Sequence, residues 1–291
     1  MPNCKKSFGG QAVIEGVMMR GRETVAIAVR KPNREIVVHK TTFCPAARRY
    51  PILKLPILRG VVALVESLTI GIGALTYSAN QVADEEEQLS PREMALSVVV
   101  ALALGAGLFI VLPTVLVRFL VPQAAQGTRV IYLNLLEGAL RIGIFLLYIT
   151  GISLLKDIQR FFAYHGAEHK VIHAYEAGRP LTMEEIRPMS PLHPRCGTAF
   201  LLYVMVVSIL VFSLLGWQNL ALRILARLAL LPVVAGLAYE LIRLGGRVQS
   251  PLLNLFLVPG LLLQRLTTRE PDAGQIEVAI RALEAVLAEE G

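Results

Sequence analysis

The sequence predicts a mainly α, polytopic helical membrane protein with about four transmembrane helices, additional interfacial or re-entrant helices and a small N-terminal cytosolic β-hairpin region. Composition is the first reason: 54% of the 291 residues are hydrophobic, a larger share than an ordinary soluble domain contains. Length is the second, because several apolar stretches reach the roughly 20 residues that cross about 30 Å of hydrocarbon.

Before the first span, residues 1–55 are expected to form a β-rich cytosolic region. Two β-branched runs, Thr24–Val29 and Glu35–Lys40, are separated by a turn-forming Lys-Pro-Asn-Arg sequence, which predicts a hairpin. Glycines between Gly9 and Gly21 are too frequent for a helix and match no nucleotide-binding template, so we expect tight turns there. Glu15 lies in this run as a candidate base or metal ligand, with a turn-capping carboxylate as the alternative.

Four uncharged or nearly uncharged stretches are predicted to span the membrane: Met94–Val117, Leu133–Leu155, Gly197–Trp217 and Ala221–Ile242. Within the second, Glu137 and Arg141 are four residues apart and are expected to neutralise each other. Within the fourth, Arg223 and Arg227 lie near one end, from which their side chains are expected to reach the headgroups.

Two further apolar stretches are harder to assign. Ile57–Ala79 contains Arg59 and Glu66 and could span the membrane, lie in the interface or turn back inside it. A crossing would put the basic N-terminus and the histidine-rich loop on opposite sides, so it is interpreted as an interfacial or re-entrant helix pair. Pro251–Leu263 is too short to cross unaided and is a second such element. Residues 275–287 show helical periodicity and predict an amphipathic helix. The predicted regions are therefore 1–55 (β-rich), 56–93 (interfacial helices and acidic connector), 94–155 (two spans), 156–196 (histidine-rich helix and loop), 197–243 (two spans) and 244–291 (re-entrant segment and terminal helix).

Charge distribution predicts the orientation of the chain. The formal net charge is +7, and the basic residues gather in residues 1–55, in the loop 156–195 and after residue 243. The positive-inside rule then places both termini and the histidine-rich loop in the cytoplasm, which explains the charge without a nucleic-acid partner. Three cysteines without a preceding signal peptide are expected to be reduced thiols.

A cluster of histidines is the strongest chemical signal. Four of the five histidines fall between positions 165 and 193. A helix is expected over residues 156–176, on which His165 and His169 lie one turn apart, about 6 Å along the axis, a spacing suited to one metal ion. Glu168 completes H-x-x-E-H, the inverse of the zincin motif, in which the glutamate activates a water molecule held by the metal.

Further ligands are available nearby. His173 continues the same helical stripe, and the proline-bounded loop that follows offers His193 and Cys196. The expected cofactor is Zn²⁺ or another divalent transition metal. Two alternatives stay open: the histidines as anchors at the membrane surface, and a fully ligated zinc with a structural role.

These parts favour a metal-dependent hydrolase at the cytosolic membrane surface, with Glu168 as the base and a lipid-like or membrane-proximal peptide substrate. Basic residues around the cluster would bind an anionic group of that substrate: Lys170, Arg179, Arg187 and Arg195. An ion or solute transporter with a cation-binding histidine cluster is the first alternative, and a membrane scaffold with a structural metal is the second. The lipid bilayer is the expected partner, and a homo-oligomer is left open.

Four strings carry a resemblance to a known family: GGQAVIEGVMMRG, FFAYHGAEHKVIHAYE, SPLHPRCGT and QRLTTREP. Together they are similar to the YqhQ-like family of bacterial membrane proteins, a domain-of-unknown-function family, over nearly the whole chain. The resemblance implies a multi-pass protein of the bacterial cytoplasmic (inner) membrane. It implies no activity and no ligand set, so the predicted metal site depends on the residues alone.

Overall fold

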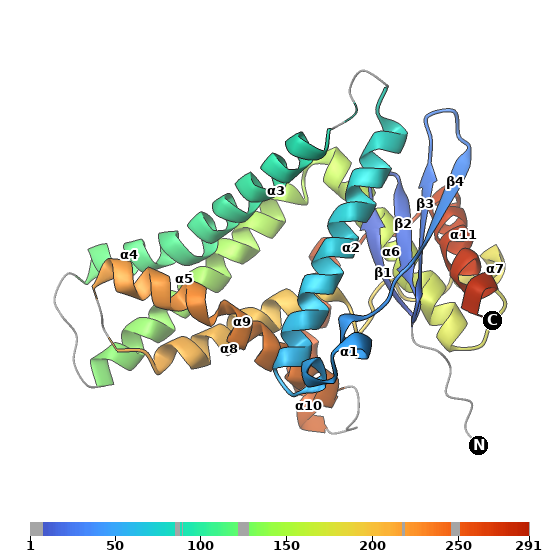
Figure 1. Ribbon diagram of the computed structural model, residues 1–291. Helices are drawn as coiled ribbons and strands as arrows, with labels where there is room; N and C mark the ends of the chain where they lie inside the picture. The colour runs from blue at the N-terminus through green and yellow to red at the C-terminus, as the bar shows by residue number, and fades with distance from the viewer. Residues whose placement is uncertain are drawn as a thin grey trace.

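The computed structural model describes residues 8–84, 88, 90–121, 128–216, 219–245 and 251–290, without the side chains of residues 128–129, 245 and 251–257 (Figure 1). Its elements, in order, are β1 (Gly9–Val13), β2 (Gly16–Arg20), β3 (Thr24–Arg30), β4 (Ile36–Thr42), α1 (Ala46–Arg49), η1 (Pro51–Lys54), α2 (Leu58–Val82), α3 (Pro91–Ala106), η3 (Gly107–Val111), α4 (Leu112–Leu120), α5 (Thr128–Ile152), α6 (Lys156–Glu176), α7 (Met183–Ile186), α8 (Gly197–Ser213), α9 (Leu220–Gly245), α10 (Pro251–Thr267) and α11 (Ala273–Glu290).

A four-stranded antiparallel sheet in the order β1-β2-β3-β4 forms the core of a body outside the helical bundle. Alternate residues of a strand point to opposite faces. In β3, Val25, Ile27 and Val29 face α2, whereas Ala26 and Ala28 pack against α6 and α11. The sheet is therefore covered on both faces, with α2 on one side and α6 with α11 on the other (Figure 1).

The predicted hairpin is confirmed as β3 and β4, which pair from Thr24 with Thr42 to Arg30 with Ile36. A tight turn expected between Gly9 and Gly21 is present between Val13 and Gly16, and the residues on either side form strands β1 and β2. Only Ile14 and Glu15 lie in the turn between them. The buried apolar residues among the glycines pack into the two cores of the body, which offsets the low strand propensity of glycine.

The helical bundle contains the four predicted spans as helices: α3 to α4 with the π-helical turn η3 between them, α5, α8 and α9. By length and composition, Pro91–Leu120, Val130–Ile152 and Leu220–Leu244 are able to cross a membrane. Helix α8 is shorter, at 17 residues, or about 25 Å of rise. The end of the predicted third span at Trp217 lies outside the described residues.

Two of these helices have one end next to the sheet body. Helix α5 ends at Ile152 and is followed at once by α6, and α8 begins beside α6 at Cys196. In Figure 1, α3 begins and α5 ends at the same end of the bundle. Glu240 near the end of α9 pairs with Arg59 at the start of α2. The sheet body lies at one end of the bundle.

Helix α2 differs from the helix pair that was predicted for Ile57–Ala79. Residues 58–82 form one continuous helix, not a helix pair. It is a fourth candidate span by length and composition, but Ala74 and its neighbours cover the sheet, so that half is occupied by protein contacts. Val65 and Leu68 expose 57% and 51% of their surface. The interfacial interpretation of this stretch therefore stays a prediction, since its length and composition also suit a span.

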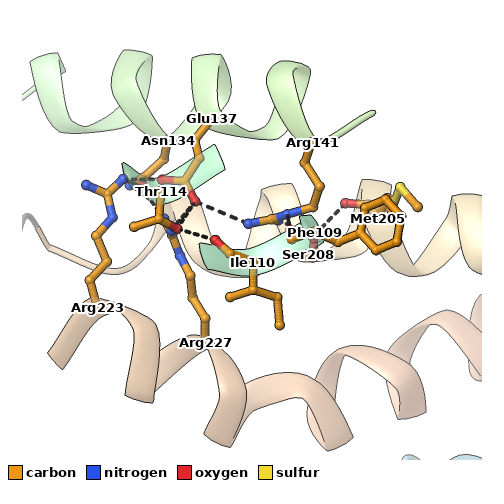
Figure 2. Close-up of polar contacts among 10 residues, drawn as sticks. All are labelled: Phe109, Ile110, Thr114, Asn134, Glu137, Arg141, Met205, Ser208, Arg223 and Arg227. Carbon is orange, nitrogen blue, oxygen red and sulfur yellow. Dashed lines mark hydrogen bonds and ion pairs between the residues drawn. The ribbon is translucent and has the colours of Figure 1, made fainter. Parts of the chain in front are cut away.

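The arginines of α9 correct a further prediction. Arg223 and Arg227 do not extend to the end of the helix; their side chains are 5% and 2% exposed and bind Glu137 of α5 inside the bundle (Figure 2). The predicted pairing of Glu137 with Arg141 is present, at 3.2 Å. The Glu137 carboxylate pairs with the guanidinium groups of Arg223 and Arg227 inside the bundle. Without it, these groups would have to extend to water at the membrane surface.

The last two helices occur where they were expected. Helix α10 packs on α8, where Gly260 lies against Tyr203. Helix α11 buries Ile276, Ala279 and Leu283 against the sheet, so the amphipathic pattern predicted for residues 275–287 is confirmed.

Close packing of α6 on the segment after α10 gives a stability prediction. A Cβ at Gly166 would lie 2.1 Å from the Arg269 carbonyl oxygen. We expect Gly166→Ala to lower stability by about 1–3 kcal/mol, as overpacking does. Gly73→Ala is the matched control, because nothing lies within 4 Å of its added Cβ and alanine favours a helix. Thermal unfolding in detergent measures both, and equal melting temperatures would contradict the described packing.

Candidate metal centre

Helix α6 carries the two central histidines and is nearly completely buried along its middle. It runs from Lys156 to Glu176, as predicted, and ends before Gly178, whose φ of 72° is the left-handed conformation typical of a helix stop. His165 and His169 lie one turn apart with ring centroids 4.4 Å from each other. Both are buried, with 8% and 1% of their surface exposed.

The third residue of the centre, Cys196, caps the N-terminus of α8. Its Sγ accepts a hydrogen bond from the Thr198 backbone N–H and lies 3.1 Å from His165 Nε2. A ring nitrogen of His169 lies within 4.8 Å of the same sulfur. The loop before Cys196 is held by two reciprocal bonds: the His193 N–H donates to Gln264 Oε1 at 2.8 Å, and Gln264 Nε2 donates to the His193 carbonyl at 2.7 Å.

Backbone carbonyls fix the tautomer of both imidazoles. His165 Nδ1 lies 2.8 Å from the Thr267 carbonyl, and His169 Nδ1 lies 2.6 Å from the Pro191 carbonyl. A carbonyl only accepts, so both Nδ1 atoms carry the proton. Both Nε2 atoms then keep a lone pair toward the thiol. A histidine whose second nitrogen donates to a carbonyl is the usual arrangement of a metal ligand.

The donor set fits a soft or borderline divalent ion. The ligand atoms of His165, His169 and Cys196 all lie within 4.8 Å of one another. Tetrahedral zinc with Zn–N near 2.0 Å and Zn–S near 2.3 Å requires ligand separations of about 3.5 Å, so small side-chain shifts would complete the set. Three protein ligands, rather than four, are typical of zinc sites that keep a position for water or substrate.

Electrostatics favours the ligating forms. Burial acts to raise the pKa of the Cys196 thiol, but its contacts with His169 and Thr198 bring that pKa below its ordinary value. Burial lowers the pKa of His169, which keeps this imidazole neutral. A thiolate at a helix N-terminus and a neutral imidazole are the forms that bind metal.

Glu168 lies on α6 beside the centre and is not part of the ligand group. It is 4% exposed, and its Oε2 has no hydrogen-bond partner among the residues that the structure describes. Burial raises the pKa of this carboxyl to about 8, and the charge of His165 opposes the rise. The Glu168 side chain packs against Gly10 of strand β1. A side chain at position 10 would clash with it, because an added Cβ would lie 2.7 Å from the glutamate. The predicted base is thus an unpartnered carboxyl next to the predicted metal ligands.

His173 and His193, the other two predicted ligands, form a separate pair with ring centroids 4.7 Å apart. His173 Nε2 donates to the Leu192 carbonyl at 2.8 Å. His193 Nδ1 accepts from the Arg195 N–H, and its Nε2 lies 3.4 Å from Glu176, which also pairs with Arg195. With both ring nitrogens of His193 used, these residues brace the loop that carries Cys196.

Glu15, the second predicted catalytic residue, also lies outside the ligand group. It occupies the β1–β2 turn with a φ of 50°. Its carboxylate forms an ion pair with Arg160 and accepts from Tyr164 Oη at 3.2 Å. The turn-capping alternative is closer to this role, in which Glu15 ties the turn to the start of α6.

Supporting residues of the centre were not recognised in the sequence. The imidazoles are oriented by the backbone carbonyls of Thr267 and Pro191, and the His193 backbone is held by the side-chain amide of Gln264. Contacts that involve the backbone produce no recognisable pattern of side-chain type or spacing in a sequence. Thr198 carried a weak signal, since a hydroxyl two residues after a cysteine at a helix start is placed to donate to it.

Comparison with known proteins supports the family resemblance and adds no activity. A family described as "Protein of unknown function (DUF1385)" matches residues 55–289. "Uncharacterized protein YqhQ" of Bacillus subtilis (strain 168) is 37% identical over 294 residues, covering 97% of this chain and 92% of the relative. No solved structure matches. The similarity to the YqhQ-like family is confirmed.

The geometry predicts which histidines hold metal. We expect the purified protein to bind about one equivalent of Zn²⁺, and His169→Ala to weaken this affinity by at least about tenfold, because it removes one of three convergent ligands. His173→Ala is the matched control on the same helix and should keep the metal. Elemental analysis and competition with a chromophoric chelator measure both. Equal metal content in wild type and His169→Ala would contradict the centre.

Proposed function

We propose that this chain, which belongs to the DUF1385 family, is a membrane-embedded metal-dependent hydrolase with its site at the cytosolic membrane surface. One observation carries the proposal: two imidazoles with their Nε2 lone pairs free converge with a thiol, and an unpartnered carboxyl lies beside them. Three ligands and a nearby base are the parts from which zinc hydrolases are built.

The division of roles follows from the contacts. His165, His169 and Cys196 would hold the ion, while the Thr267 and Pro191 carbonyls orient the two imidazoles. A bound divalent ion would acidify water and polarise a carbonyl or phosphoryl oxygen. Glu168, once ionised above its pKa of about 8, would take the proton released from the attacking water, since its Oε2 has no competing donor among the described residues.

The position of the centre favours a lipid-like or membrane-proximal peptide substrate. It forms where α6 meets the first turn of α8 and the last turn of α10, the part of the sheet body nearest the bundle. Three of the four basic residues that were expected to bind an anionic group of the substrate are already paired with carboxylates. Lys170 pairs with Glu270, Arg179 with Glu185 and Arg195 with Glu176.

The two alternative functions have less support. The acidic residues of a cation path would have to share a cavity, yet Glu66 pairs with Arg20, Glu240 with Arg59, and Glu137 with three arginines of the bundle. These are three separate ion-paired sites. A scaffold with a structural metal agrees with the buried ligands, but it leaves the unpartnered Glu168 carboxyl without a role.

The Glu168→Gln variant separates hydrolase from scaffold. Glutamine keeps the shape and the burial of the side chain but takes up no proton, so we expect normal zinc content and a rate lower by about 10²–10⁴-fold. The probes are vesicles of phosphatidylglycerol with a fluorescent acyl chain, and fluorescently labelled casein. His169→Ala should lose both zinc and activity. Zinc-loaded wild type that cleaves neither probe, or Glu168→Gln with an unchanged rate, would contradict the proposal.

We also propose that the sheet body and both termini face the cytoplasm, since the basic regions of the chain gather there. Cys44 is exposed and Cys196 is buried, so a Cys4→Ser variant offers one reactive thiol. In membrane vesicles of known sidedness, a charged maleimide should label Cys44 only from the cytoplasmic side. A variant with Asn219→Cys and Cys44→Ser as well should be labelled only from the other side. The reversed pattern would contradict this orientation.

A further inference from the structure

The inside of the helical bundle contains a charged cluster that the proposed hydrolase does not use. Figure 2 shows Arg141 of α5, and Arg223 and Arg227 of α9, converging on Glu137 of α5. Their side chains are at most 6% exposed. Thr114 Oγ1 donates to Glu137 Oε1 at 2.9 Å, and Asn134 Oδ1 accepts from Arg223 at 3.0 Å.

Charge in this cluster does not balance. Three guanidinium groups carry +3 and one carboxylate carries −1, which leaves +2. Glu137 is the only acidic residue between Glu93 and Asp157, and none occurs between Glu185 and Glu240, which pairs with Arg59 near the other end of α9. Uncompensated charge in a buried membrane site is costly and marks a functional site more often than a structural one.

One donor in the cluster is left unused. Arg227 is 1% exposed and its Nε has no hydrogen-bond partner in the part of the chain that the structure describes, although its terminal nitrogens reach Glu137, Thr114 and Asn134. An unpaired N–H of a charged group at this depth costs free energy that an acceptor would recover. The π-helical turn η3 lies beside the cluster and presents the Phe109 carbonyl to Arg141 Nε at 2.7 Å. Turns of this kind are frequent at functional sites.

The cluster lies toward the end of the bundle opposite the sheet body. Arg223 is three residues and Arg227 seven residues into α9, which is about 5 and 10 Å of helical rise. Thr114 is six residues before the end of α4, and Asn134 is six residues into α5. An anion would therefore reach the cluster from the far membrane surface, not from the metal centre.

We propose that this cluster binds a phosphate group. Guanidinium groups match the planar edges of oxyanions with paired, charge-assisted hydrogen bonds. A phosphate with two negative charges would neutralise the excess of +2, and its oxygens would accept from Arg227 Nε. The phosphodiester of a phospholipid headgroup in the far leaflet offers the same acceptor oxygens but carries one negative charge, so it would offset half of the excess. The proposal is independent of the hydrolase.

A self-contained structural hub is the alternative, in which Glu137 alone holds α4, α5 and α9 together. The two accounts differ at Glu137→Gln. For a hub, this variant removes the central charge, destabilises the bundle and responds to no anion. For a phosphate site, it raises the excess charge to +3, so phosphate binds at least as tightly as to wild type and stabilises the variant more.

The experiment uses the full chain purified in a phospholipid-free detergent. Thermal unfolding is followed over a series of phosphate concentrations, with chloride adjusted to hold ionic strength constant, and bound phospholipid is measured by native mass spectrometry. The variants are Glu137→Gln, Arg227→Gln and Arg227→Lys. The lysine variant keeps the positive charge but lacks the planar guanidinium group with its paired N–H donors. Arg243→Gln, at the other end of α9, is the matched control.

We expect phosphate to raise the melting temperature of wild type, Glu137→Gln and Arg243→Gln, with about tenfold or greater loss of affinity in Arg227→Gln and a partial loss in Arg227→Lys. If the headgroup of a lipid is the occupant, the variants differ in the same order in the amount of bound phospholipid, while free phosphate does not change the melting temperature. Wild type that shows neither response, or Arg227→Gln that keeps either in full, would overturn the proposal.

Discussion

Helix α6 is the element on which both halves of the molecule depend. One face packs Ala167 and Val171 into the core under the sheet, and another directs His165 and His169 toward the start of α8. Its close approach to the segment after α10 is possible because residue 166 has no side chain. The sheet, the membrane helices and the metal centre therefore share one rigid support. A ligand set built on such a helix is held more precisely than one built on loops.

Most of the architecture could be predicted from residue patterns, because the bilayer imposes simple rules on length and hydrophobicity. Helix α6 was predicted with its observed bounds, since Gly178 and Pro180 stop it. Predictions were incomplete or wrong where a tertiary contact overrides a local rule. The glycine-rich start forms strands because its alternate apolar residues are buried on the two faces of the sheet, and Arg223 and Arg227 stay inside because Glu137 lies across from them.

The candidate metal centre was only partly predictable, for a different reason. Spacing on a helix identifies which residues of that helix share a face, so the pairing of His165 with His169 follows from the sequence. Which residue of a distant loop completes the set depends on how α8 and α10 meet α6. Cys196 and His193 were equally available by sequence, and the reciprocal bonds between Gln264 and the His193 backbone turn the imidazole of His193 toward Glu176.

The carboxylate of Glu290, on the last turn of α11, accepts hydrogen bonds from the backbone N–H groups of Glu23 and Thr24, between β2 and β3. The strands are synthesised before α11, the helix that completes one of their two cores. Contacts of such long sequence separation form late. The apolar face of the sheet that α11 covers therefore stays open while the intervening membrane helices are made, which exposes it to wrong contacts in the meantime.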